Sequence, residues 1–294
     1  MTRSRGVEGK NLSRKMLSAA KYALFRHMSR WFLKKSAERW RIYPFGTDCL
    51  GSRADYSRLF WEAETRTYPN IDNYERELGY EINRAWLAEL ALHTQVVIKA
   101  SRLCYEHGRV LYSCLSDYVS RHQPDQGRIT IVETGTARGF SALCMAKALA
   151  DADRQGLILT FDVLPHNVPM MWNCIDDLDK AKTRGELLAP WDALVQPYVV
   201  FVEGESSVML SRVQVERINF AFIDAMHTED DVRSEFQYIQ DKQRSGDVVV
   251  FDDYSVAKFP EVVRTVDQIC IDFAYDARVV QANRDRGYLV ATRR

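Results

Sequence analysis

Three aspartates follow two strand-like runs in the C-terminal half of the chain. Asp224 ends the apolar run 219–224, and Asp252 and Asp253 follow the run that begins at Val248. Neighbouring strands lie about 4.8 Å apart, so adjacent parallel strands would bring the three carboxylates together at one edge of a sheet. Without a counter-charge they would raise one another's pKa. Because oxygen ligands suit Mg²⁺, we expect Asp224, Asp252 and Asp253 to hold a magnesium ion; the alternative is that Asp252 and Asp253 cap the turn after their strand.

A glycine-containing loop follows an earlier apolar run, 129–133. The run ends in Glu133 and leads into Thr134-Gly135-Thr136-Ala137-Arg138-Gly139. The two glycines let the backbone turn tightly and approach a ligand closely. A helix after Gly139 would present free N–H groups at the carboxyl end of the strand, where open α/β sheets bind ligands. The spacing differs from the G-x-G-x-x-G of dinucleotide-binding proteins, and a ligand-free turn is the alternative.

A further acidic residue, Asp162, ends the second apolar run, 27 residues after Gly135. A carboxylate at this position can accept hydrogen bonds from both hydroxyls of a ribose, a requirement of several nucleotide-binding folds. The alternative is that Asp162 caps the end of the strand or the turn after it.

These residues need a sheet to position them, and the sequence after residue 125 has the pattern of one. Short apolar runs lie at 129–133, 157–162, 198–203, 219–224 and 248–252. Helical patterns between and after them lie near 139–150, 206–213, 228–243 and 260–274. This alternation predicts an α/β fold, a Rossmann-like doubly wound and mostly parallel sheet. Two final runs, 278–282 and 288–292, are joined by a short polar turn and predict a C-terminal antiparallel hairpin.

The loop from Glu133 to Gly139 resembles motif I of the class I S-adenosylmethionine-dependent methyltransferases. The resemblance implies that this loop surrounds the methionine part of the cofactor, with Glu133 near its amino group. The residues that it assigns to the cofactor are Glu133, Gly135, Thr136, Gly139, Asp162, Glu205, Ser206 and Asp224. Among these, Asp162 would bind the ribose, and Glu205 and Ser206 would border the adenine.

The segments Asp224-Ala-Met-His227 and Asp252-Asp253-Tyr254 are similar to the methyltransferase-24-like family. Within that family they resemble metal-dependent O-methyltransferases that act on sugar hydroxyls of macrolides and aminocoumarins. The resemblance implies that the aspartates bind Mg²⁺ and that His227 is the general base. It covers residues 129–294 well and the first 125 poorly. We therefore expect an adenosylmethionine-dependent transferase whose acceptor is a hydroxyl on a sugar or another small molecule.

Two other functions stay open. One is a non-catalytic module that binds adenosylmethionine, and the other is a methyltransferase directed to RNA. Enzymes that methylate nucleic-acid bases would be expected to carry an Asn- or Asp-Pro-Pro-aromatic element after the fourth strand, where this chain has Asp-Ala-Met-His. Nucleic acid is therefore disfavoured, and only the basic N-terminus keeps RNA in consideration.

The first 125 residues are expected to form a helical region before the methyltransferase domain at 126–294. Residues 1–45 hold twelve Lys and Arg against Glu8 and Glu38. An amphipathic basic helix near 14–40 could lie on an anionic membrane surface; packing on its own domain, or on a second copy in a homo-oligomer, is the alternative. Further helices are expected over 80–119, with Gly108 as the break between them.

Composition limits the cellular setting. The six cysteines are scattered, with no C-x-x-C pair, which favours a reducing, cytoplasmic compartment over a disulfide framework or a zinc site. The sequence has no run of about 18 uncharged apolar residues, so we expect no membrane-spanning helix.

Overall fold

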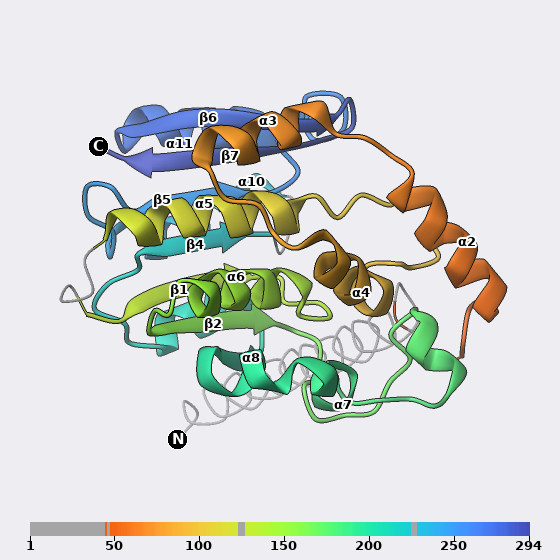
Figure 1. The fold of residues 1–294 in the computed structure, drawn as a ribbon. Helices are drawn as coiled ribbons and strands as arrows, with labels where there is room; N and C mark the ends of the chain where they lie inside the picture. The colour runs from red at the N-terminus through yellow and green to blue at the C-terminus, as the bar shows by residue number, and fades with distance from the viewer. Residues whose placement is uncertain (1–44, 46–47, 123–126, 225–227) are drawn as a thin grey trace, which may run out of the picture. The chain divides into compact units, whose positions relative to one another are not determined.

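The computed structural model describes residues 45, 48–122, 127–224 and 228–294. The basic segment 14–40 and His227 lie outside these residues. The described part contains a seven-stranded sheet with the order β3-β2-β1-β4-β5-β7-β6 (Figure 1). The strands are β1 (Ile129–Thr134), β2 (Gly156–Asp162), β3 (Val199–Glu203), β4 (Phe220–Ile223), β5 (Val248–Phe251), β6 (Tyr275–Asn283) and β7 (Arg286–Arg293).

The first five strands are parallel, and β7 runs antiparallel to both β5 and β6. The register pairs Thr134 with Ile223 and Ile223 with Phe251. The strands β1, β4 and β5 therefore end at the same edge of the sheet. This arrangement confirms the predicted Rossmann-like sheet with its C-terminal hairpin, and it confirms that β4 and β5 are neighbours.

Helices cover both faces because alternate strand residues point to opposite sides of the sheet. Ile131 belongs to a core with α5 (His107–Arg121) and α6 (Phe140–Asp151), whereas Val132 belongs to a core with α10 (Glu229–Gln240) and α11 (Pro260–Asp272). Burial of these apolar side chains is the main force that holds the layers together.

Three helices precede α5: α2 (Arg53–Glu64), α3 (Pro69–Leu78) and α4 (Arg84–Thr94). Their buried side chains belong to the same core as α5, α6 and one face of the sheet. The turn before residue 126 therefore does not separate two hydrophobic cores. Helix α2 begins at a capping box formed by Ser52 and Asp55, and α3 begins with Pro69, which suits the first turn of a helix.

Gly108 does not break a helix, so this sequence-based prediction is wrong. The break lies between α4 and α5, at 95–106, and Gly108 is the second residue of α5. A Cβ at Gly108 would lie 2.7 Å from the ring of Phe140. The glycine is there because α5 packs closely against α6, where no side chain has room.

A long insertion joins β2 to β3. It contains η2 (Ile175–Leu178), α7 (Arg184–Leu188), η3 (Ala189–Trp191) and α8 (Asp192–Tyr198). Trp172 is fully buried and donates a hydrogen bond of 2.7 Å to the carbonyl oxygen of Lys182. The Asn173 side chain bonds both backbone groups of Ile98. The insertion is thus packed onto the domain.

A short pair of turns, α9 (Ser206–Met209) and η4 (Leu210–Arg212), follows β3 in place of the longer helix expected near 206–213. Among the described residues, no helix is both long and apolar enough to cross a membrane.

Candidate functional site

The loop after β1 has the backbone that its glycines predict. Gly135 and Gly139 have φ values of 89° and 90°, in the left-handed region that favours glycine. The N–H of Gly135 donates to the carbonyl oxygen of Phe161 at 2.9 Å, which ties the loop to β2. A Cβ at Gly139 would lie 2.8 Å from Cδ1 of Leu188. The loop therefore turns tightly and delivers the N-terminus of α6 to the carboxyl edge of the sheet.

Glu133 lies beneath this loop, fully buried. Its carboxylate accepts hydrogen bonds from the hydroxyls of Ser141 and Thr160, and the Thr160 and Thr136 hydroxyls are 2.5 Å apart. Burial raises the pKa of Glu133 to about 7, although the two hydroxyl hydrogen bonds act against the shift. Glu133 and Thr136 thus belong to one buried polar network that links β1, β2 and α6.

Asp162, at the end of β2, binds the glycine loop directly. Its side chain accepts hydrogen bonds from the N–H groups of Ala137, at 2.5 Å, and Leu164, at 2.7 Å. Ala137 itself has a φ of 45°, unusual for a residue other than glycine. The bond to Ala137 therefore stabilises the strained part of the loop, and the bond to Leu164 caps the turn after β2.

Arg184 contacts both Asp162 and the glycine loop. Sequence analysis did not single it out for the cofactor site. Arg184 is buried, its Nε donates to the carbonyl oxygen of Ala137 at 2.9 Å, and its Nη2 lies 4.0 Å from Asp162. Burial raises the pKa of Asp162, and the guanidinium opposes that shift. An arginine within an aromatic-rich insertion gives no sequence signal that it will reach a loop 47 residues earlier.

The loop after β3 is joined to the same region through Glu235 of α10. Ser206 and Thr134 both donate hydroxyl hydrogen bonds to the Glu235 carboxylate, the second at 2.7 Å. Burial raises the pKa of Glu235 to about 7 against the effect of both hydrogen bonds. Glu205 precedes Ser206 and is exposed. The residues expected at the adenine are therefore next to the β1 loop, and Glu235 connects the two loops.

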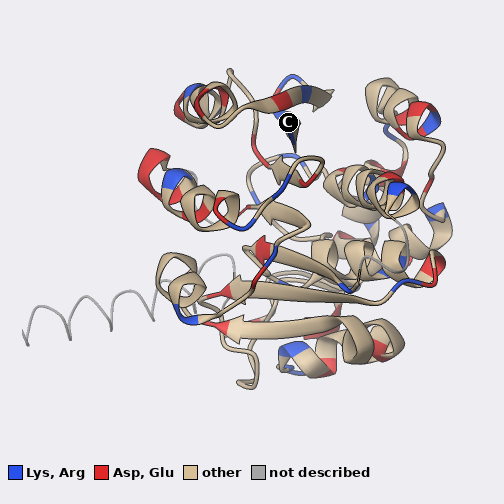
Figure 2. Ribbon diagram, turned by 90° about the vertical axis from the view of Figure 1, so that its left-hand side faces the viewer, with Lys and Arg blue, Asp and Glu red and all other residues tan. Residues whose placement is uncertain are grey.

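An arginine lies within the acidic cluster formed by Asp224, Asp252 and Asp253 at the ends of β4 and β5. Acidic residues end β2 and β3 and directly follow β4 and β5 at this edge (Figure 2). Arg286, the first residue of β7, forms an ion pair with Asp252 through Nη2 and another with Asp253 through Nη1, the latter at 2.6 Å. Both carboxylates are almost fully buried. One guanidinium thus compensates two carboxylates.

The pKa values of Asp224 and Asp252 are shifted in opposite directions. Burial raises the pKa of Asp224 well above its usual range, and the negative charge of Asp252 adds to the shift. Burial also acts to raise the pKa of Asp252, but Arg286 and a hydrogen bond from Asp224 outweigh it and lower that pKa. Of these two carboxyl groups, Asp224 therefore holds a proton more readily than Asp252.

A magnesium ion does not fit this arrangement of side chains. Among the described residues, no group of three His, Cys, Asp or Glu side chains is disposed to hold a metal. In the predicted set, Arg286 takes one carboxylate oxygen from each of Asp252 and Asp253. A cation placed among them would lie against a guanidinium of the same charge.

Three buried polar atoms near this cluster have no hydrogen-bond partner in the described part of the chain: Oδ1 of Asp252, Nε of Arg286 and Nδ1 of His107. His107 interacts electrostatically with both Asp252 and Arg286, and burial lowers its pKa to about 3. Buried polar atoms are normally hydrogen-bonded, so this cluster has unused capacity for a polar ligand or for water.

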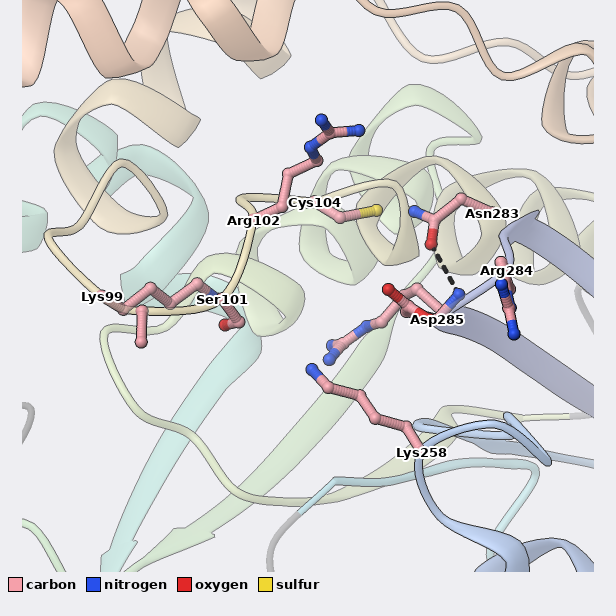
Figure 3. A pocket seen from close by; sticks show the side chains of 10 residues that line it. Lys99, Ser101, Arg102, Cys104, Lys258, Asn283, Arg284 and Asp285 are labelled. Atoms are coloured by element: carbon pink, nitrogen blue, oxygen red, sulfur yellow. Dashed lines mark hydrogen bonds between the residues drawn. The ribbon is translucent and has the colours of Figure 1, made fainter.

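A cavity of about 420 Å³ adjoins Arg286. It lies between the α4–α5 connection, the loop after β5 and the turn between β6 and β7 (Figure 3). Its lining residues are Lys99, Ala100, Ser101, Arg102, Cys104, Lys258, Asn283, Arg284, Asp285 and Arg286. The loop after β1 lies two strands away from β5, because the order is β1-β4-β5. One edge of the sheet therefore carries the glycine loop, the acidic cluster and a cavity in succession.

Comparison with known proteins agrees with this layout. Residues 132–254 match the sequence profile of a family described as a methyltransferase domain. The fold resembles the cofactor-bound protein Rv0187 from MTB, with a TM-score of 0.50 and 19% identity over 72% of this chain and 91% of that one. It also resembles the methyltransferase PaMTH1 of Podospora anserina, solved with SAH bound, with a TM-score of 0.51 and 15% identity over 76% and 94% of the two chains. No curated protein matches the chain.

Proposed function

We propose that the chain, whose residues 132–254 match a methyltransferase domain, is a class I S-adenosylmethionine-dependent methyltransferase that transfers the methyl group of adenosylmethionine to a hydroxyl oxygen of a small molecule. The left-handed glycine loop at the carboxyl end of β1 is the observation that carries the proposal. It supplies a close backbone approach and a helix N-terminus at the edge where such sheets bind ligands.

The residues around this loop fit the donor. A Cβ at Gly139 would collide with the Leu188 side chain, so only glycine suits this position, and Asp162 and Arg184 hold the loop in its strained conformation. Glu205 is exposed and accepts a hydrogen bond of 3.3 Å from the Ser207 hydroxyl, which an adenosine would replace. The carboxylate of Glu133 is already bonded by the buried hydroxyls of Ser141 and Thr160. We therefore propose that Glu133 positions the loop through these two residues.

The donor supplies a methyl group on a positively charged sulfur. The acceptor oxygen forms the new C–O bond while the C–S bond breaks with its electron pair left on sulfur, and the hydroxyl proton passes to a base. The protein's part is to orient the hydroxyl and accept its proton. We propose that Oδ1 of Asp252 and Nε of Arg286 orient that hydroxyl, because both atoms are buried and lack a partner among the described residues.

His227 is our proposed base. It follows Asp224 by three residues. Asp224 lies at the carboxyl end of β4, beside the glycine loop and β5. A sugar hydroxyl is the acceptor that the resemblance favours. Magnesium assistance through Asp224, Asp252 and Asp253 is the competing route, and it would require Arg286 to leave the cluster.

The basic N-terminal segment supports a separate proposal. Its twelve Lys and Arg would attract the anionic surface of a membrane from the cytoplasmic side. Packing against a second copy of the chain is the other proposed use of the same segment.

Two glycine variants test donor binding. Gly139 and Gly246 have φ values of 90° and 88°, but only Gly139 has a close neighbour for a Cβ. Both Gly139→Ala and Gly246→Ala should lose about 1–2 kcal/mol of stability from left-handed strain. Calorimetry should show that Gly139→Ala binds adenosylmethionine about tenfold or more weakly, while Gly246→Ala binds it like the parent. Parental affinity in folded Gly139→Ala would remove the basis for the donor site.

A further inference from the structure

We propose that the cavity beside Arg286 binds an anionic group, a carboxylate or a phosphate, on the acceptor molecule. The inference rests on the proposed function and names the substrate class of that site: a small hydroxyl compound that carries a negative charge. The hydroxyl would lie at Asp252 and Arg286, and the anionic group would lie toward the basic rim of the cavity.

The charges that line the cavity are strongly unbalanced. Lys99, Arg102, Lys258 and Arg284 contribute four cations besides Arg286, and the one acidic lining residue is Asp285. These cations come from three separate segments that meet at the cavity (Figure 3). Like charges that converge from different elements repel one another, so an anion bound among them would be stabilised.

The four rim cations have no counter-ion within the described residues. None of them forms an ion pair or a side-chain hydrogen bond there, and all four side chains are exposed. Arg286 differs, because its guanidinium is engaged by Asp252 and Asp253. The rim charges are therefore available to a ligand.

Lys99 reports the local potential. Although the Lys99 side chain reaches solvent, the protein around it removes part of its hydration and so lowers its pKa, and the positive charges of Arg286 and Arg138 lower it further. Asp285 does not neutralise this group, since it forms no ion pair with a described residue; its backbone N–H donates to Asn283 Oδ1 at 2.9 Å (Figure 3). The cavity thus favours negative charge in spite of its one carboxylate.

The volume and the position of the cavity select a small acceptor. Ligand sites for small molecules are typically about 300–1,000 Å³, and this one measures about 420 Å³. Arg286 lines the cavity, and its Nε and the Oδ1 of its ion-pair partner Asp252 are buried atoms without a hydrogen-bond partner among the described residues. A molecule with a hydroxyl at one end and an anionic group at the other would satisfy both ends of the cavity.

The direct test is binding of matched probes to the full chain. The probes are 4-hydroxybenzoate, 4-hydroxyphenyl phosphate and the neutral 4-hydroxybenzyl alcohol, titrated by calorimetry in the presence of S-adenosylhomocysteine. At least one anionic probe should bind about tenfold more tightly than the alcohol, an advantage that weakens as salt screens the charges. The benzoate and phosphate arms identify which anion the cavity prefers. Equal binding of all three probes would overturn the proposal.

Charge variants locate the effect. Lys258→Gln combined with Arg284→Gln should remove most of the preference for the anionic probe. Asp285→Asn should increase it, because the variant deletes the one carboxylate that lines the cavity. Arg264→Gln is the matched control, since Arg264 is an exposed arginine on α11 away from the cavity lining. An unchanged preference in the double variant would contradict the assignment.

Two further measurements distinguish a failure of the anion site from a failure of the proposed methyltransferase function. Binding of adenosylmethionine to the full chain tests the donor site without reference to the acceptor. If the chain prefers the anionic probes but does not bind adenosylmethionine, the proposed function fails and the anion site stands. A short single-stranded RNA is the last arm. Tight RNA binding that the small anions do not displace, and that the double variant loses, would assign the basic rim to a nucleic acid and overturn the small-molecule class.

Discussion

Arg286 compensates two buried carboxylates with one side chain, and its loss has a calculable consequence. Arg286→Met would leave Asp252 and Asp253 buried without their counter-charge. Breaking a buried ion pair in this way typically costs about 3–5 kcal/mol. We expect a loss of that size in the free energy of unfolding in urea, and Arg286→Lys should recover part of it because the charge returns without the two-pronged geometry.

The Arg286→Met variant also tests whether the arginine or a magnesium ion compensates the charge of the aspartates. The parent's stability and methyl transfer should not change when magnesium is added or chelated, because Arg286 already supplies the positive charge. In Arg286→Met, Asp252 and Asp253 lose their guanidinium partner, and added Mg²⁺ should restore stability if their oxygens and those of Asp224 can converge on an ion. Suppression of the parent's activity by a chelator, with recovery on added Mg²⁺, would instead support the magnesium route predicted from the aspartates.

The proposed role of His227 as general base has a kinetic test. General-base assistance typically contributes 10²–10⁴-fold, so His227→Ala should lower the methyl-transfer rate by about that factor with little change in donor affinity. The parent's rate should fall at acid pH as the imidazole protonates, and that limb should be absent from the variant. Single-turnover pH–rate profiles measure both. If the variant keeps the rate and the acid limb, another group takes the proton.

At the scale of elements, Glu235 joins two loops through a carboxylate whose pKa burial raises from 4.5 to about 7. A group with a raised carboxyl pKa binds more protons in the folded state, so its contribution to stability falls as pH rises from about 4.5 to about 7. Glu235→Gln removes this titration while it keeps an acceptor for Thr134 or Ser206. Relative to the parent, the variant should gain stability across that window by at most about 3 kcal/mol.

Denaturant unfolding at several pH values between those limits measures this gain. Glu261→Gln, at an exposed site on α11, is the control and should follow the parent. Glu133 also titrates in this window, but it is present in every protein of the series and cancels in the comparison. A Glu235→Gln curve parallel to the parent's would mean that Glu235 is ionised throughout.

Elements that repeat a simple pattern were predictable from the sequence, and contacts between distant elements were not. Apolar runs located β1 to β5, and their strand ends located Asp162, Asp224 and Asp252. Arg286 was missed because nothing local to a hairpin turn indicates that it will reach Asp252, 34 residues earlier. The helix break was misplaced at Gly108 because a glycine needed for close packing and a glycine that ends a helix look alike in sequence.

At the scale of the whole molecule, the charge is divided unevenly. Residues 1–45 hold twelve Lys and Arg against two acidic residues, an excess of ten, while the chain as a whole is neutral. The residues after 45 are therefore acidic overall, although they contain the basic rim of the cavity. Among the described residues, the buried side chains of both hydrophobic cores come from Tyr56 onward. The fold of the described domain and the charge of the N-terminal segment can therefore be separated by experiment.

A protein limited to residues 48–294 should fold and bind adenosylmethionine with the affinity of the full chain, because this compact unit contains both cores and every donor residue. The full chain should sediment with phosphatidylserine vesicles, since each Lys or Arg near an anionic surface contributes about 1 kcal/mol. Phosphatidylcholine vesicles and high salt should abolish that attachment, because the attraction is screened within a Debye length. The shortened protein should bind neither kind of vesicle. If it is insoluble, or if only the full chain forms a dimer, the segment packs against protein and the membrane proposal fails.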